Sequence, residues 1–258
     1  MALEPQHVSL AGRVALVTGA AVGLGEAIAI TFARFGADLA ICDRDRDNLA
    51  ATAREVSAAG RRVFQAQLDV RDSEAVTRFV ADALRELGAL DILVNNAGGG
   101  FQAPFLDVEP KGQRALVDEN FTSVTNFVRA VAPHLPDGSG SIVNLTSIEA
   151  HRASPGYAIY AAMKAAVANL TQSLALELGP RGIRVNCIAP DVIPTPGIGA
   201  FEANTPLARV GHPDDVAGAA VFLASSLSHF VTGTTIHVDG GNLAAGGWRR
   251  DAAGRFGT

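Results

Sequence analysis

One pair of side chains has the spacing that proton transfer from an alcohol requires: Tyr160 and Lys164 in Tyr160-Ala-Ala-Met-Lys164. Positions i and i+4 of a helix share a face, so the Tyr160 hydroxyl and the Lys164 ammonium can point into one cleft. A phenol with a pKa of about 10 is a weak base at neutral pH, and a neighbouring cation favours the phenolate. A tyrosine tuned in this way can exchange a proton with an alcohol or carbonyl oxygen while hydride moves at the adjoining carbon.

Chance alone produces this spacing in many helices, but the composition of this chain makes chance a weak explanation. The sequence has two tyrosines and only two lysines, Lys111 and Lys164. The other tyrosine, Tyr157, has an alanine four residues later, so we interpret it as a pocket wall or a core residue. Glu149 and His151, a few residues earlier, either face a substrate or are solvated loop residues.

A glycine-rich turn near the start of the sequence has the composition of a phosphate-binding loop. An apolar run at 14–17 leads into Thr18-Gly-Ala-Ala-Val-Gly-Leu-Gly25, and a helical pattern follows. Glycines let the backbone approach a pyrophosphate, whose charge the helix N-terminal amides can meet. Asp43 ends the next apolar run, where a carboxylate can accept both ribose hydroxyls and repel a 2′-phosphate. The pattern predicts NAD, while Arg44 directly after Asp43 leaves NADP open.

Short β-branched runs alternate with helical patterns from end to end, which predicts a doubly wound α/β fold. Most runs are continuously apolar, as expected for a parallel sheet with helices on both faces. The expected strands are 14–17, 38–42, 63–67, 92–94, 141–145, 184–188 and 234–238. The expected helices are 23–35, 46–59, 73–87, 114–132, 157–178 and 213–224, with Gly36, Gly88 and Pro213 at helix ends. No linker divides the chain, so we expect one domain over 1–258, in which 242–258 forms a C-terminal tail.

The composition argues against several function classes. The 258 residues are 48% apolar and 18% charged, and a net charge of −5 gives no general attraction to nucleic acid or an anionic membrane. The sequence shows no secretory h-region and no run long enough to span a membrane. Cys42 and Cys187 lie in separate apolar runs, which suggests reduced thiols in a cytoplasmic protein. The six histidines show no ligand spacing with one another or with the cysteines, so no metal site is expected.

With these features in place, the chain resembles the classical short-chain dehydrogenase/reductase family over nearly its whole length. The resemblance rests on the glycine spacing in 18–25, Asn95-Asn-Ala-Gly98, the Tyr160–Lys164 pair with Ser147 thirteen residues before it, and Val238-Asp-Gly-Gly241. It implies a single Rossmann-type domain with a seven-stranded parallel sheet between two layers of helices. Val22 stands where NADP-preferring relatives often have a basic residue, so the resemblance also favours NAD.

The resemblance further implies a role for each residue of the site. Tyr160 would be the general acid/base, Ser147 would hydrogen-bond the substrate oxygen, and Lys164 would also hold the nicotinamide ribose. Asn120 would anchor a proton-relay water, and Asp69 would contact the adenine. The implied cofactor-binding residues are Gly19, Val22, Gly23, Leu24, Gly25, Asp43, Arg44, Leu68, Asp69, Val70, Asn96, Ala97, Gly98, Tyr160, Lys164, Pro190, Asp191, Ile193 and Thr195.

The segment after the sixth expected strand departs from the family's pattern. Asp191 follows Pro190, where family members usually have glycine, and Ile193 and Thr195 stand where the family contacts the nicotinamide carboxamide. A carboxylate near the nicotinamide would favour the oxidised, cationic ring, so we hypothesise that Asp191 strengthens NAD⁺ retention. The alternative is that Asp191 points to solvent or caps a turn. The stretch 195–209 is short for a family that commonly places a helical lid there, which predicts an open site.

The expected function is hydride transfer between NAD(H) and a small-molecule secondary alcohol/ketone pair. A related alternative is a 3-oxoacyl-thioester reductase acting on an acyl-carrier-protein or CoA substrate, but Asp43, Val22 and the scarcity of lysine argue against carrier docking. A nucleotide-sensing protein would have a broken tyrosine–lysine pair, and a sugar epimerase would differ in glycine spacing. We also expect a homotetramer, with packing inside one domain as the alternative, because the helix 157–178 has small residues that let a second copy approach: Ala161, Ala162, Ala165, Ala166 and Ala168.

Overall fold

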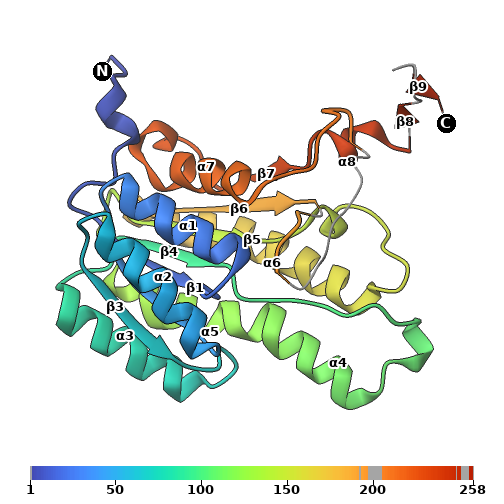
Figure 1. Ribbon diagram of the computed structural model, residues 1–258, viewed down its shortest axis with the longest axis horizontal. Coiled ribbons are helices and arrows are strands. Elements are labelled where there is room, and N and C mark those ends of the chain that lie inside the picture. The colour runs from blue at the N-terminus through green and yellow to red at the C-terminus, as the bar shows by residue number, and fades with distance from the viewer. Residues whose placement is uncertain (1, 192, 197–204, 248, 251–255, 258) are drawn as a thin grey trace.

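The computed structural model describes residues 2–191, 193–196, 205–247, 249–250 and 256–257. Its main strands are β1 (Val14–Thr18), β2 (Asp38–Asp43), β3 (Val63–Gln67), β4 (Ile92–Asn95), β5 (Ser141–Leu145), β6 (Arg184–Pro190) and β7 (Thr235–Val238). They form one parallel sheet in the order β3-β2-β1-β4-β5-β6-β7 (Figure 1). The predicted doubly wound fold with a seven-stranded parallel sheet is confirmed.

The position of each strand in the sheet explains its burial. Every residue of β1, β4, β5 and β6 is buried, whereas β3 and β7, at the two edges, are partly exposed. Inner strands have helices against both faces, so both faces must be apolar. The strand order reverses between β1 and β4, and ligands of doubly wound folds bind in the crevice at the carboxyl ends of the strands there.

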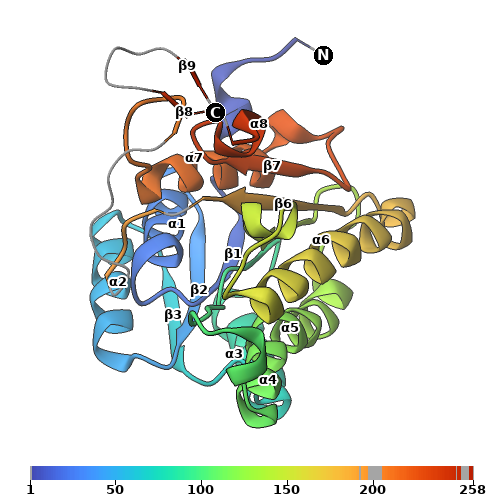
Figure 2. The ribbon, with the colours of Figure 1, turned by 90° about the vertical axis from the view of Figure 1, so that its right-hand side faces the viewer.

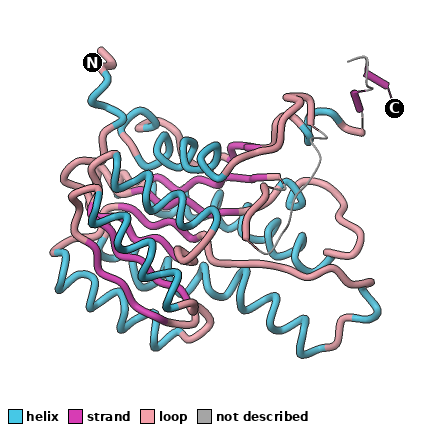
Figure 3. The backbone as a smooth tube through the Cα atoms, in the orientation of Figure 1, coloured by secondary structure: helices cyan, strands magenta, loops and turns pink. Residues whose placement is uncertain are grey.

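Helices cover both faces of this sheet. They are α1 (Gly23–Arg34), α2 (Arg46–Ala58), α3 (Ser73–Leu87), α4 (Pro110–Val117), α5 (Ser123–Val131), α6 (Ala158–Leu178) and α7 (Pro213–Ala224). Figure 2 shows α1, α2 and α7 on one side of the sheet and α3, α5 and α6 on the other. The tube in Figure 3 shows the strands enclosed between these layers. Each layer closes its own apolar core, one containing Ile28 and Phe32 and the other Phe79 and Phe127.

The residues expected at helix ends have the predicted conformations. Gly36 and Gly88 have φ angles of +100° and +86°, in the left-handed region that residues with a Cβ rarely adopt. Gly88 is the C-cap of α3. Pro213 lies in the first turn of α7, and His212 and Asp215 form a capping box around it.

The expected helix over 114–132 is wrong in two respects. The observed helix begins earlier than predicted, at Pro110, because proline suits the first turn of a helix. It is also interrupted by a π-helical turn, Asp118–Thr122, which separates α4 from α5. Asn120 lies inside this turn and is fully buried. Periodicity analysis assumes a constant helical repeat, so it could not reveal a π turn.

The segment assigned to a C-terminal tail begins directly after the sheet. Its described residues form a short helix, α8 (Asn242–Ala245), and two paired two-residue strands, β8 (Arg249–Arg250) and β9 (Phe256–Gly257). Figure 1 shows this strand pair projecting away from the sheet, beyond α8. Across the described ranges, no helix combines the length and the apolarity needed to cross a membrane.

Candidate active site

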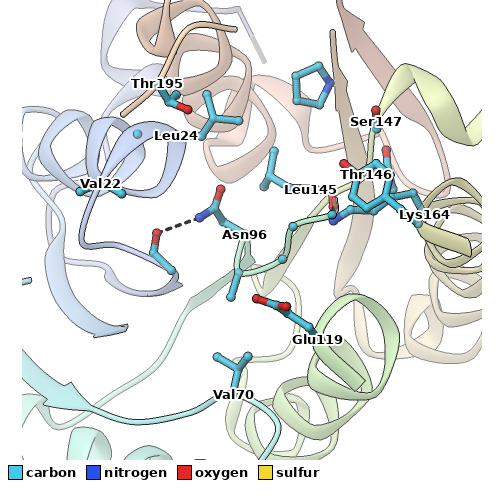
Figure 4. Close-up of a pocket in the computed structure, with 18 of the residues that line it drawn as sticks. Val22, Leu24, Val70, Asn96, Glu119, Leu145, Thr146, Ser147, Lys164 and Thr195 are labelled. Atoms are coloured by element: carbon cyan, nitrogen blue, oxygen red, sulfur yellow. Dashed lines mark hydrogen bonds between the residues drawn. The ribbon is translucent and has the colours of Figure 1, made fainter. Parts of the chain in front are cut away.

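A cleft of about 740 Å³ opens at the carboxyl edge of the sheet. It brings together nearly all residues that the sequence assigns to a cofactor or to catalysis: Gly19, Val22, Gly23, Leu24, Asp43, Arg44, Leu68, Asp69, Val70, Asn96, Ala97, Gly98, Ser147, Tyr160, Lys164, Pro190, Asp191, Ile193 and Thr195. Gly25 and Asn120 do not line the cleft. In Figure 4, Ser147 and Lys164 lie on one side of the cleft, and Val22 and Thr195 lie on the other. We call the region around Tyr160 and Ser147 the tyrosine end, and the region around 19–24 and Asp43 the glycine-loop end.

The Tyr160–Lys164 pair lies near the start of α6, and both residues line the cleft. Lys164 is 4% exposed, and its Nζ donates a hydrogen bond to the main-chain oxygen of Leu145 at 3.0 Å. The same Nζ lies 5.6 Å from the centroid of the Tyr160 ring. The helical placement of this pair on one face, expected from the sequence, is therefore present.

Burial dominates the ionisation of both side chains. It lowers the pKa of Lys164 to about 8 and raises the pKa of Tyr160 above its ordinary value. Hydrogen bonding with Ser147 lowers the pKa of Tyr160, whereas Glu149 and Tyr157 raise it. Among the groups of the chain, burial therefore outweighs any lowering of the Tyr160 pKa by a neighbouring cation, and the acid/base role of Tyr160 stays a prediction. The cost of removing a phenolate from water outweighs the opposing contribution.

Ser147 follows β5 and fixes the start of the next turn. Its Oγ accepts a hydrogen bond from the main-chain N–H of Glu149 at 3.2 Å, which caps the 3₁₀ turn Ile148–Ala150. The Ser147 hydroxyl also lies within hydrogen-bonding reach of Tyr160, whose pKa it lowers. Two hydroxyl groups from different elements thus meet at the tyrosine end.

Asn120 lies in the π turn behind the cleft, and its side chain bonds to the loop that follows β4. Its Oδ1 accepts from the Gly99 N–H at 3.1 Å, and its Nδ2 donates to the carbonyl oxygens of Gly99 and Leu116 at 2.8 and 2.9 Å. A Cβ at Gly98 would lie 2.8 Å from Asn120 Oδ1 and 3.0 Å from Lys164 Nζ, so the loop needs glycine where it passes between them. Asn120 therefore supports this loop, and its implied role with a relay water stays a prediction.

The glycine-rich turn is packed too closely to admit side chains. A Cβ at Gly25 would lie 2.0 Å from the carbonyl oxygen of Gly19, so Gly25 lets α1 cross the end of β1 from behind the cleft. The N-cap of α1 is Val22, which offers no side-chain cap to the first-turn amides. Asn96 Nδ2 donates to the carbonyl oxygens of Thr18 and Gly19, each at 3.0 Å, and ties the loop after β4 to this turn.

Asp43 ends β2 beside the glycine-rich turn. Its Oδ2 accepts from the Ala21 N–H and its Oδ1 from the Asp45 N–H, each at 3.0 Å. These bonds fix the carboxylate at the cleft, and each carboxylate oxygen keeps a second acceptor position. The neighbouring Arg44 side chain is 71% exposed, so it is held far less firmly.

Two further acidic groups reach the glycine-loop end. Arg71 donates to Asp69 and lowers the pKa of that carboxyl group. Glu119, in the π turn, also lines the cleft, and Figure 4 shows its carboxylate pointing inward. Its Oε1 lies 4.0 Å from Nη2 of Arg44. The sequence analysis missed Glu119, because the π turn that places it leaves no sign in the helical pattern.

Besides Glu119, Glu149 and Tyr157, seven lining residues are not among the assigned ones: Ala21, Asp45, Gly99, Gly100, Leu145, Thr146 and Ser154. All but Ser154 lie within two residues of an assigned position, so sequence neighbourhood was the available signal. Tyr157 lines the cleft as well, and its ring meets the Tyr160 ring edge-on at a centroid distance of 6.4 Å. The interpretation of Tyr157 as a pocket wall therefore agrees with its position.

At the tyrosine end, Glu149 faces the cleft, which was one of two possibilities that the sequence left open. Its Oε1 accepts a hydrogen bond from Arg152 Nη2 at 2.7 Å. His151 is exposed and packs edge-on against His237, with ring centroids 4.7 Å apart. Glu149 is therefore a cleft residue, whereas His151 contacts the neighbouring strand β7.

Asp191 occupies an environment that differs from the expected alternative of a solvent-exposed or turn-capping side chain. Its Oδ2 accepts from Asn242 Nδ2 at 2.6 Å, and its Oδ1 lies 3.8 Å from Arg152 Nη2. The side chain is 12% exposed, so it neither points to solvent nor caps a turn. Among the described non-glycine residues, only Ala208 has a positive φ, so Asp191 avoids the left-handed conformation open to glycine. The hypothesis on NAD⁺ retention stays a prediction, and Arg152 offsets part of the charge it needs.

The prediction of an open site depends on 195–209, of which 197–204 lie outside the described residues. Elsewhere in the chain, over the ranges that the structure describes, no three His, Cys, Asp or Glu side chains are placed to hold a metal ion.

Comparison with known proteins gives consistent matches over nearly the whole chain. A family model described as enoyl-(acyl carrier protein) reductase matches residues 19–242. The chain is 40% identical to cyclohexanol dehydrogenase of Rhodococcus sp. (strain TK6), over 91% of this chain and 97% of that protein. It is 38% identical to gluconate 5-dehydrogenase of Gluconobacter oxydans (strain 621H), over 92% of this chain and 97% of that protein. A solved structure of 7 alpha-hydroxysteroid dehydrogenase complexed with NADH and 7-oxo glycochenodeoxycholic acid matches with a TM-score of 0.89 and 34% identity, covering 93% of this chain and 98% of that one.

Proposed function

The chain belongs to the short-chain dehydrogenase/reductase family of oxidoreductases, and from that premise we propose that it transfers hydride between NAD(H) and a secondary alcohol/ketone pair. The observation that carries this proposal is the meeting of Tyr160, Ser147 and Lys164 at one end of the cleft. Tyr160 is the proposed general acid/base, and Ser147 the proposed hydrogen-bond donor to the reacting oxygen. Lys164 supplies a buried positive charge beside the tyrosine.

The residues of the cleft fit a dinucleotide. The uncapped first-turn amides of α1 suit a pyrophosphate, because a helix N-terminus favours negative charge. The free acceptor positions of Asp43 suit ribose hydroxyls. Ile193 and Tyr160 line the cleft and would hold the nicotinamide ring, whose chemistry when bound is the acceptance or return of hydride. All of these groups meet at the carboxyl edge of the sheet.

Proton transfer in the proposed reaction runs through Tyr160. During oxidation, its phenolate oxygen takes the alcohol proton while the Ser147 hydroxyl donates a hydrogen bond to the same alcohol oxygen. Since burial raises the pKa of Tyr160, the phenolate depends on nearby positive charge. Lys164, whose Nζ lies 5.6 Å from the ring centroid, is the proposed source within the chain. During reduction, the Tyr160 hydroxyl gives its proton to the carbonyl oxygen.

The proposed preference for NAD(H) rests on the charges at the glycine-loop end. Carboxylates outnumber guanidinium groups there by four to two: Asp43, Asp45, Asp69 and Glu119 against Arg44 and Arg71. The Arg71 guanidinium is already bound to Asp69, which leaves Arg44 as the cation closest to Asp43 in the chain. A 2′-phosphate would therefore meet net negative charge. The NADH complex of the solved relative supports the same preference.

A 3-oxoacyl-thioester reductase is the second candidate, and one observation favours it: a relative from Thermotoga maritima, 36% identical over 90% of this chain, is named 3-oxoacyl-[acyl-carrier-protein] reductase. The other relatives are named for a cyclic alcohol and for a sugar acid, so their names do not select one substrate class. The acidic surroundings of Asp43 favour NAD(H), and we rank the alcohol dehydrogenase first for that reason.

The proposal extends to assembly and location. Helix α6 buries only Lys164, Val167, Thr171 and Ala175 of its 21 residues, which leaves its alanine-rich surface for another copy and supports a homotetramer. Cys42 and Cys187 are both free and buried, which supports a cytoplasmic location. We propose one domain over 1–258, with small molecules rather than nucleic acid or membrane as partners.

The proposal is tested by incubating the purified protein with NAD⁺ or NADP⁺ and secondary alcohols, and by following the absorbance of the reduced cofactor. The alcohols include cyclic alcohols, steroids, sugars and hydroxyacyl thioesters, with Tyr160→Phe as the control for enzymatic turnover. We expect reduction of NAD⁺ in preference to NADP⁺ with a simple secondary alcohol. Turnover confined to hydroxyacyl thioesters would favour the second candidate, and no turnover with any alcohol would contradict the proposal.

A further inference from the structure

We propose that the tyrosine end selects alcohols that are uncharged or cationic near the reacting carbon, and rejects those that bear a carboxylate or phosphate there. Two carboxylates in the wall of the cleft, Glu149 and Asp191, pair with one guanidinium group, Arg152, and the charge of a third carboxylate, Asp239, acts on the same guanidinium. The inference rests on the proposed function, because it concerns the substrate of the same site.

Glu149 is the member of this group nearest to the proposed chemistry. It lines the cleft two residues after Ser147, and its side chain is 20% exposed. Its negative charge raises the pKa of Tyr160, so the carboxylate acts electrostatically on the hydroxyl that would hold the substrate oxygen. An anionic group on a substrate bound to Tyr160 would meet the same repulsion.

Asp191 adds a second negative charge from the end of β6. It lines the cleft, and its carboxylate is held in place by Asn242 at 2.6 Å. Asn242 begins α8, so the segment after β7 fixes the position of this charge. Asp239, at the end of β7, is 9% exposed, and its carboxylate accepts from the main-chain N–H groups of Gly241 and Leu243. Neither carboxylate can turn away without losing these bonds.

Arg152 could in principle bind an anionic substrate, but its guanidinium group is already paired with carboxylates of the chain. Its Nη2 and Nε donate to Glu149 Oε1 at 2.7 and 3.3 Å, and Asp191 lies 3.8 Å from the same Nη2. Glu149, Asp191 and Asp239 all raise the pKa of Arg152, so it stays protonated and bound to them. A substrate carboxylate would have to replace Glu149 and leave that residue unpaired, which is costly in a partly buried site.

The remaining groups around this wall do not reverse the sign of its net negative charge. Burial and His237 lower the pKa of His151, so the His151 ring adds no positive charge at neutral pH or above. Lys164 lies below the wall, where its ammonium is 4% exposed and bonded to Leu145. Ser154 and Tyr157 line the cleft nearby and offer neutral hydroxyl groups. The wall therefore carries an excess of negative charge together with neutral hydrogen-bonding groups, which suits uncharged alcohols.

Matched pairs of ligands test this inference. The probes are 4-hydroxycyclohexanecarboxylate and 3-hydroxybutyrate, each compared with its carboxamide, which has nearly the same shape and no charge. Calorimetry on the NAD⁺-loaded protein gives the dissociation constants, and NADH absorbance gives kcat/KM in parallel. For the better-binding pair, we expect the amide to bind at least about tenfold more tightly than the carboxylate.

A double variant and a matched control test whether the carboxylates of the wall cause this preference for the amide. Glu149→Gln with Asp191→Asn should reduce the preference to about threefold or less, whereas Glu55→Gln, an equal charge change on exposed α2, should preserve it. In the unaltered protein, salt at about 1 M should also weaken the preference, because it shortens the screening length to about 3 Å. Equal or tighter binding of the carboxylate, no binding of either amide, or a preference unchanged in the double variant would overturn the inference. If the amide is preferred but no secondary alcohol reduces NAD⁺, the proposed function fails while the inference on charge stands.

Discussion

The two ends of the cleft use different parts of the chain. At the glycine-loop end, glycines of the turn line the cleft, and the side chains of Asp43 and Asn96 bond to main-chain groups of the neighbouring turn. At the tyrosine end, charged side chains pair with one another: Arg152 donates to Glu149 in its own segment and lies 3.8 Å from Asp191, which follows β6.

This difference separates what relatives share from what distinguishes them. Contacts to main-chain atoms depend on backbone path and on glycine, so they suit a cofactor common to a whole family. Contacts among side chains change with single substitutions, so they suit a substrate that differs from one member to the next. Each prediction below changes one end of the cleft and asks whether the other end responds.

The largest expected effect comes from the removal of a single oxygen atom at the tyrosine end. Tyr160→Phe removes the proposed acid/base while the ring still fills its space, so turnover should fall roughly 10²–10⁴-fold. NAD⁺ binding, measured by calorimetry, should stay within about threefold because the glycine-loop end is untouched. Tyr157→Phe, which loses the same atom on the same helix, should keep turnover within about tenfold. A Tyr160→Phe enzyme that retains most of its turnover would remove Tyr160 from the proposed role.

Substitution of Lys164 tests whether a charge needed for turnover at the tyrosine end lowers the free energy of unfolding. The pKa of Lys164 is lowered from 10.5 to about 8, which corresponds to roughly 3 kcal/mol of destabilisation at neutral pH. Lys164→Met removes the buried charge but also the bond to Leu145, so we expect a net gain of about 2 kcal/mol in the free energy of unfolding at pH 7. Turnover should fall at the same time.

The pH dependence of that gain gives a sharper test. The folded-state pKa of Lys164 lies below the unfolded value, so the penalty is fully present below pH 8 and is lost as pH rises to 10.5. Urea unfolding of the wild type and Lys164→Met at several pH values should show the difference vanishing over that window. A variant that is less stable than the wild type at pH 7 would contradict this account.

Asp43 tests the glycine-loop end alone. Asp43→Asn removes the charge that opposes a 2′-phosphate, and its one carbonyl oxygen can keep one of the two hydrogen bonds from main-chain amides. The ratio of kcat/KM with NAD⁺ to that with NADP⁺ should fall about tenfold, equivalent to about 1.4 kcal/mol. Asp47→Asn is the matched control, because it makes the same charge change at an exposed position of α2. Equal ratios in the two variants would show that general charge, and not Asp43, sets the cofactor preference.

The smallest expected effect is a change in the pH profile of oxidation. Four groups act on Tyr160 or lie beside its ring: Ser147, Glu149, Tyr157 and Lys164. Glu149 raises the pKa of Tyr160, so Glu149→Gln should lower it and move the rising limb of kcat/KM to lower pH. NAD⁺ affinity should not change. A shift toward higher pH would have the wrong sign for a like-charge effect and would contradict the electrostatic account.

Local sequence patterns predicted most of the fold and the cleft. Apolar runs locate the seven strands, and the spacing of Tyr160 and Lys164 places both side chains in the cleft, because each depends on a regular backbone repeat. Asp43 was predictable for the same reason, since the end of a strand in this fold leads to the cleft.

The features that the sequence did not predict depend on irregular or distant contacts. Glu119 reaches the cleft only through a π turn, which a regular periodicity cannot describe. Asp191 pairs with Asn242, which is 51 residues away, and no local pattern reports that contact. The raised pKa of Tyr160 is set by burial, a property of the folded environment rather than of the i, i+4 spacing.

Direct hydride transfer at the tyrosine end is the central claim, and isotope transfer tests it directly. The wild type is incubated with NAD⁺ and a turned-over secondary alcohol that has deuterium on the carbinol carbon, and the NADH formed is examined by mass spectrometry. The account predicts one deuterium in each NADH molecule, and loss of this transfer in Tyr160→Phe while NAD⁺ still binds. Unlabelled NADH, with the deuterium released to water, would contradict it.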